Sequence, residues 1–145
     1  PASCPCRGEA ERQGHEAPQG LGPRSLRIMP QLIDSPTRIP VPGGKIIDEY
    51  VGRATTGEAA VSVAHMKAPA GWDEPAQTPE FDEVTLVLAG TVVVEHDNGE
   101  LVVPAGQAVV THAGERVRYR VGDQGAEYVA VCLPAFSPDL AHRQD

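Results

Sequence analysis

Residues 91–103 read TVVVEHDNGELVV, two apolar runs separated by Asp97-Asn98-Gly99. Valine favours extended strands, and an Asn-Gly pair supplies the positive φ angles of a tight hairpin turn. This stretch therefore predicts a β-hairpin whose strands cover residues 91–96 and 100–104.

On both sides of this hairpin, valine recurs and turn residues interrupt the chain every six to ten positions. Further strands are predicted at residues 45–52, 59–68, 83–89, 107–112, 116–121 and 126–133. The sequence Gly122-Asp123-Gln124-Gly125 predicts a second, looser hairpin between the last two strands. Fifteen glycines and fourteen prolines, one residue in five, leave little room for long helices. Eight short strands predict an all-β domain, a jelly roll or a small barrel.

The length of 145 residues suits one domain. Residues 1–28 mix proline, glycine, glutamine and charges, and cannot build a core of their own. We expect them to be a disordered or non-native leader upstream of Met29, in which Cys4 and Cys6 are chance thiols. The ordered domain is predicted to cover residues 29–136, and a polar C-terminal tail residues 137–145.

The charge balance is acidic. Twelve Lys plus Arg against twenty Asp plus Glu give a net charge of -8, with no basic run that could neutralise a row of phosphates. Nucleic acid is therefore excluded as a partner at this stage. No apolar stretch is long enough to cross a membrane, and the N-terminus lacks the apolar block of a signal peptide. We expect a cytoplasmic protein without membrane partners, of bacterial origin given ten arginines against two lysines.

Two spaced motifs resemble those of the cupin family, which implies a jelly-roll barrel. The first motif is matched by both glycines and the glutamate, and its five positions are Gly71, Gln77, Pro79, Glu83 and Gly90. The second motif is matched by its glycines only, and its positions are Gly106, His112, Gly114, Val117 and Val121. Residues 72–83 and 132–136 look like the EutQ-like group, named for an ethanolamine-utilisation protein.

The resemblance also implies where a metal would bind, and three of the four ligand positions are changed. They hold Gln77, Pro79 and Val117, and only Glu83 remains. Proline and valine offer no side-chain donor, and one carboxylate cannot hold a transition metal against water. We expect no metal cofactor. The alternative is a relocated site that uses His65 or His112.

Residues 73–83 hold five acids and no base, and crowded acids raise one another's pKa. With Glu83 facing inward as in cupins, strand alternation brings Tyr119 to the same interior. A pocket is predicted with Glu83 as general acid or base, Tyr119 as hydrogen-bond donor and Gln77 as orienting residue. The further ligand-binding candidates are Trp72, Glu80, Phe81, His65 and Val117. The simpler alternative makes the acids a solvated loop and Glu83 a satisfied buried carboxylate.

The function predicted at this stage is binding of a small metabolite in the barrel, and metal-independent acid/base chemistry of the isomerase, cyclase or lyase type. One alternative is a non-catalytic module that senses a metabolite or has a structural role. The other is a metal-dependent cupin enzyme with relocated histidines. A homodimer is expected, because small cupins commonly pair and the strand at residues 45–52 offers an edge. Arg116, Arg118 and Arg120 share the opposite face of one strand and are expected to pair with surface acids.

Overall fold

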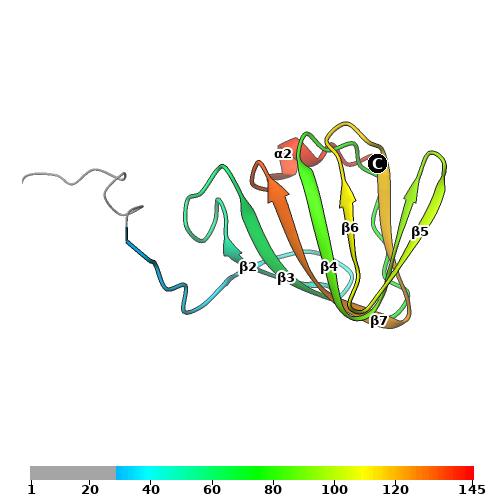
Figure 1. Cartoon of the computed structure of the whole chain (residues 1–145), viewed down its shortest axis with the longest axis horizontal. Coiled ribbons are helices and arrows are strands. Elements are labelled where there is room, and N and C mark those ends of the chain that lie inside the picture. The colour runs from blue at the N-terminus through cyan, green and yellow to red at the C-terminus, as the bar shows by residue number, and fades with distance from the viewer. Residues whose placement is uncertain (1–28) are drawn as a thin grey trace, which may run out of the picture. The chain divides into compact units, whose positions relative to one another are not determined.

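The computed structural model describes residues 29–145, so the predicted leader and its two cysteines lie outside the described residues. One compact unit covers Ile33–Asp145. Seven strands and one short helix lie in the described part of the chain (Figure 1). They are β1 (Thr37–Ile39), β2 (Ile46–Val51), β3 (Ser62–Ala68), β4 (Asp82–His96), β5 (Gly99–Pro104), β6 (Ala108–Thr111), β7 (Val117–Leu133) and α2 (Pro138–Ala141).

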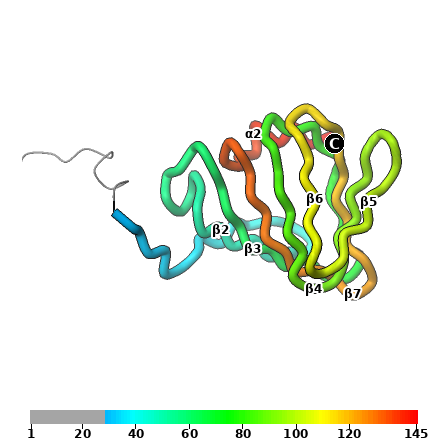
Figure 2. The backbone as a smooth tube through the Cα atoms, in the orientation of Figure 1, coloured from blue at the N-terminus to red at the C-terminus, as the bar shows by residue number. Residues whose placement is uncertain are grey.

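The strands pair antiparallel in the order β1-β2-β3-β7-β4-β5, and β6 pairs with β4. The 15-residue strand β4 borders β6 along its first half and β5 along its second half. The 17-residue strand β7 follows β4 through both halves, as the backbone trace shows (Figure 2). The predicted all-β jelly-roll fold is confirmed.

The predicted hairpin at residues 91–103 is present between β4 and β5. His96 pairs with Gly99, so Asp97 and Asn98 form the two-residue loop. Of the two residues in the Asn-Gly pair, only Gly99 has a positive φ, 135°.

The second predicted hairpin, at residues 122–125, is wrong. β7 continues through this segment, because β4 pairs with the strand on both sides of it: Gly90 faces Ala126, and Val92 faces Val121. The segment is a bulge opposite β4. Gly90 has φ +73°, and a Cβ there would lie 2.0 Å from the carbonyl oxygen of Gly125. Glycine therefore permits the close backbone approach at this bend.

The core lies inside the barrel, where alternate side chains of β4 and β7 meet. Val87 faces Tyr128, and Val94 faces Tyr119, and all four are buried. A smaller cluster closes one end, where the rings of Phe81 and Phe136 meet edge to face with centroids 5.8 Å apart.

The C-terminal residues pack along the segment that precedes β4. Ser137 caps α2 by accepting a hydrogen bond from the backbone N–H of Leu140. The N–H of Glu80 donates to the carbonyl of Leu140 at 2.9 Å, and the N–H of Gln144 to that of Ala76 at 2.8 Å. These bonds hold the tail beside the barrel mouth. Within residues 29–145, no helix is long and apolar enough to cross a membrane.

Candidate functional site

Polar side chains meet inside the barrel. Glu83 on β4 faces Cys132 on β7 and Thr111 on β6. The hydroxyls of Thr111 and Tyr119 are hydrogen-bonded at 2.9 Å, and Glu83 accepts a long bond of 3.4 Å from the hydroxyl of Thr85.

Gln77 reaches the same interior from the segment before β4. Its backbone N–H donates to the carbonyl of Val117 at 2.8 Å, and its backbone carbonyl accepts the reciprocal bond from the N–H of Val117 at 2.9 Å. Directly paired residues share one face of a sheet, so both side chains point inward. Among the residues that the structure describes, Gln77 Oε1 is the one buried side-chain polar atom without a partner.

The interior alters the protonation of its acids. Burial, and then the nearby charge of Glu74, raise the pKa of Glu83 from 4.5 to about 7, against a lowering effect of Lys45. Glu83 therefore exchanges its proton near neutral pH. Burial also raises the pKa of Tyr119, so its phenol stays protonated.

A cavity of about 260 Å³ opens at the barrel mouth. Its charged and aromatic lining residues are an indole, two cations and two carboxylates, from Trp72, Lys45, Arg143, Glu74 and Asp73. Lys45 Nζ lies 3.9 Å from the centroid of the Trp72 ring, and Arg143 Nη2 lies 3.6 Å from Glu74 Oε2. Burial lowers the pKa of Lys45 and raises that of Glu74. Each charged group at this mouth thus has a neighbour of opposite charge.

Sequence reasoning missed two of these lining residues, Lys45 and Arg143. Lys45 precedes β2 and Arg143 lies in the C-terminal tail, and no local pattern links either residue to Trp72. The strand order and the pairing of the tail with residue 77 bring them together.

The predicted site residues separate into two groups. The barrel interior and its mouth contain Glu83, Tyr119, Gln77, Val117 and Trp72.

The remaining candidates lie elsewhere. Phe81 is buried in the end cluster. Glu80 is exposed and pairs with the ring Nε2 of His142 at 2.7 Å. His65 Nε2 pairs with Glu127 at 2.7 Å, on the face of β3 opposite to that of the buried Ala64.

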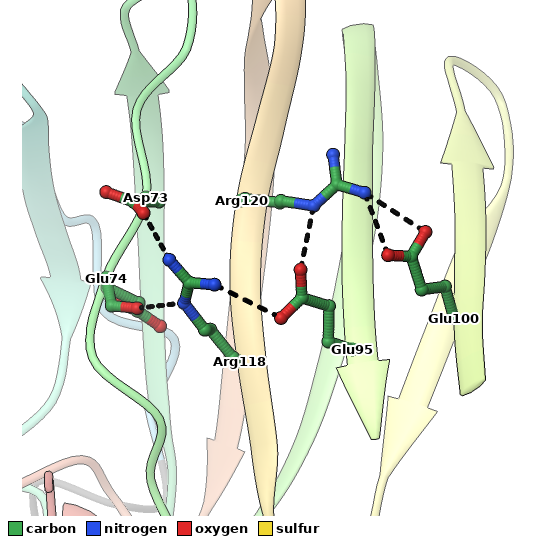
Figure 3. A network of polar contacts seen from close by, with 6 residues as sticks. All are labelled: Asp73, Glu74, Glu95, Glu100, Arg118 and Arg120. Carbon is green, nitrogen blue, oxygen red and sulfur yellow. Dashed lines mark hydrogen bonds and ion pairs between the residues drawn. The ribbon is translucent and has the colours of Figure 1, made fainter. Parts of the chain in front are cut away.

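A charged network on the outside of the barrel supports the segment that carries Trp72 and Glu74 (Figure 3). Arg118 pairs with Asp73 and Glu95, and its Nε donates to the carbonyl of Glu74 at 3.1 Å. Arg120 pairs with Glu95 and with Glu100, each at 3.0 Å. The network continues across β7, β4 and β5 and fixes the outer side of the mouth.

The described residues do not fit a metal centre. Within residues 29–145, no group of three or more His, Cys, Asp or Glu side chains could hold a metal ion. Lys45 lies beside Glu74 and Glu83 and competes with any cation. His112 is exposed, with Nδ1 3.9 Å from Asp82, and is not directed at the interior carboxyls.

Comparison with known proteins gives one close sequence relative. The endoribonuclease YbeY of Myxococcus xanthus is 49% identical over 107 residues, which are 73% of this chain and 36% of that protein. The chain thus spans about a third of the length of this relative. No family model matches the chain.

Solved structures share the fold at low identity. A Streptomyces Pac13 variant, crystallised with uridine, has a TM-score of 0.64 at 14% identity, over 80% of this chain and 89% of that chain. A putative ethanolamine utilization protein Q from Salmonella typhimurium has a TM-score of 0.51 at 20% identity, over 63% and 71% of the two chains. Both support the barrel fold alone.

The Myxococcus relative corrects the family and the function predicted from sequence. It has the name of an RNA-cleaving enzyme, which contradicts the EutQ-like assignment, the small-metabolite function and both of its alternatives. The motif glycines on which the resemblance was based are explained by backbone conformation, as Gly90 is at its bend. They therefore indicate the fold and not the activity.

The same relative overturns the predicted exclusion of nucleic acid, and with it the small-molecule ligand as the expected partner. The homodimer stays a prediction. Net charge was the basis for that exclusion. A sum over the whole chain does not detect cations that the fold gathers locally, such as Lys45 and Arg143 at the mouth.

Proposed function

We propose that this chain takes part in RNA cleavage, as a β-barrel domain of an endoribonuclease that holds RNA while cleavage occurs elsewhere. The observation that carries this proposal is the 49% identity over 107 residues to the Myxococcus enzyme. The matched segment is 36% of that enzyme, so most of its length lies outside the match. The proposal places the protein in the cytoplasm.

The chemistry of the described residues supports holding rather than cutting. Phosphodiester cleavage needs a metal-activated nucleophile or an acid and a base at the reacting atoms. Among the described residues, Glu83 has no group of His, Cys, Asp or Glu side chains around it with which it could bind a metal ion. Of the two carboxylates that line the cavity, Glu74 is engaged by Lys45 and Arg143, and Asp73 is paired with Arg118. The mouth therefore suits binding.

Two assays on the purified chain test this proposal. Fluorescence anisotropy with a labelled single-stranded RNA measures binding, and gel electrophoresis of the same RNA measures cleavage, with the Myxococcus enzyme as positive control. We expect the chain to bind the RNA and to leave it intact over the time in which the control cleaves it. A chain that does not bind RNA would refute the role in RNA cleavage. If RNA cleavage stays with the chain through repeated chromatography, so that a contaminating nuclease is excluded, the holding role is refuted.

A further inference from the structure

The cavity at the barrel mouth is lined by three kinds of side chain: aromatic, cationic and acidic. Trp72 contributes an aromatic ring, Lys45 and Arg143 contribute two cations, and Glu74 contributes a largely buried carboxylate. They come from the residue just before β2, from the segment before β4 and from the C-terminal tail. Arg118, on the outside of the barrel, holds the segment before β4 in place by donating a hydrogen bond to the carbonyl of Glu74.

These side chains are chemically complementary to the base, the phosphate and the ribose of one ribonucleotide. Every nucleobase has a π face that stacks on an aromatic side chain. The phosphate accepts charge-assisted hydrogen bonds from a guanidinium fork, and an ammonium group adds a point charge. A carboxylate accepts a hydrogen bond from the ribose 2′-hydroxyl, the group that distinguishes RNA from DNA.

Size and charge restrict the ligand further. A cavity of about 260 Å³ lies just below the roughly 300–1,000 Å³ of typical small-molecule sites, which limits its occupant to one small unit such as a single nucleotide. The lining acid Asp73 is neutralised by Arg118 on the outside. Lys45 and Arg143 then outnumber Glu74.

We propose that the mouth cavity binds one nucleotide of a single-stranded RNA, with the base on Trp72 and the phosphates on Arg143 and Lys45. This inference rests on the proposed function, and it names the site at which the domain holds RNA. Because two cations contact phosphate, the logarithm of affinity falls with the logarithm of salt concentration with a slope of about -1.4.

The test is anisotropy with fluorescein-labelled octauridylate over a range of salt concentrations. Trp72→Ala is expected to weaken binding about tenfold through loss of stacking, whereas Trp72→Phe keeps a π face and binds within about threefold of the wild type. Arg143→Gln is expected to reduce the salt slope to about -0.7. Lys67→Gln is the matched control, because it removes one exposed positive charge on β3 outside the cavity. Circular dichroism verifies that each variant is folded.

The outcomes separate this site from the proposed function. Wild-type chain that binds octauridylate while Trp72→Ala and Arg143→Gln bind it equally well overturns the cavity and leaves the role in RNA cleavage intact. Loss of binding in both variants, together with RNA cleavage by the chain itself, supports the cavity and overturns the holding role. Wild-type chain without affinity for octauridylate overturns both.

Discussion

Replacing Glu83 by glutamine should remove much of the pH dependence of folding stability. Burial raises the pKa of this carboxyl from 4.5 to about 7, so the folded state binds the proton more tightly than the unfolded chain does. The stabilising effect of the bound proton is complete below about pH 4.5. It is lost as the pH rises through 7.

The size of the effect follows from the two pKa values. At about 1.4 kcal/mol per pH unit, their difference corresponds to about 3 kcal/mol between pH 4.5 and pH values above 7. Glutamine resembles the protonated carboxyl and retains the oxygen that accepts from Thr85. Glu83→Gln should therefore match the wild type near pH 4.5 and exceed it by about 3 kcal/mol at pH 8.

Urea unfolding followed by circular dichroism at pH 5, 6, 7 and 8 measures this difference. With a slope of about 1–3 kcal/mol per molar urea, the midpoint at pH 8 should rise by about 1–3 M. The exposed Glu115→Gln is the control and should follow the wild-type profile. Parallel profiles for Glu83→Gln and the wild type would show that Glu83 titrates alike in the folded and unfolded states, and so that burial does not raise its pKa.

Three further substitutions test the buried hydrogen bond of Tyr119, the bend at Gly90 and the outer ion-pair network. Tyr119→Phe leaves the buried hydroxyl of Thr111 unpaired and should cost about 1–2 kcal/mol in urea unfolding; an unchanged midpoint would rule out that hydrogen bond. Gly90→Ala places a Cβ 2.0 Å from a facing carbonyl oxygen and should cost about 3 kcal/mol or more, whereas Gly99→Ala meets nothing within 4 Å and should cost less; equal losses would contradict the bend. Glu95→Gln, which weakens the outer network of Figure 3, should lower the urea midpoint slightly in dilute buffer and not at all in 1 M NaCl, and a loss independent of salt would argue against ion pairing.

Local patterns were sufficient for most of the strands. The valine runs and the turn at Asp97-Asn98 predict the hairpin of β4 and β5 because both signals act over a few residues. The glycines at residues 122 and 125 were misleading. Whether a strand turns back or continues depends on its partner, and here β4 pairs with β7 on both sides of the bulge. That partner is distant in the sequence.

The residues of the site likewise divide into those that local sequence patterns predict and those that only long-range contacts bring together. Strand alternation and motif spacing were enough to expect Glu83 and Tyr119 in one interior, where the structure places them. Lys45 and Arg143 have no such pattern, because their position beside Trp72 depends on the strand order and on the tail. Activity was the least predictable property, since a barrel backbone accommodates unrelated chemistry.

The intrinsic fluorescence of the protein would report directly whether RNA is held at the mouth of the barrel. Trp72 is the only tryptophan in the chain, so its emission reports on this cavity alone. Titration with unlabelled octauridylate should quench the emission with the same midpoint that anisotropy gives for the labelled RNA. An anisotropy change without any change in the emission of Trp72 would show that RNA binds outside the mouth cavity.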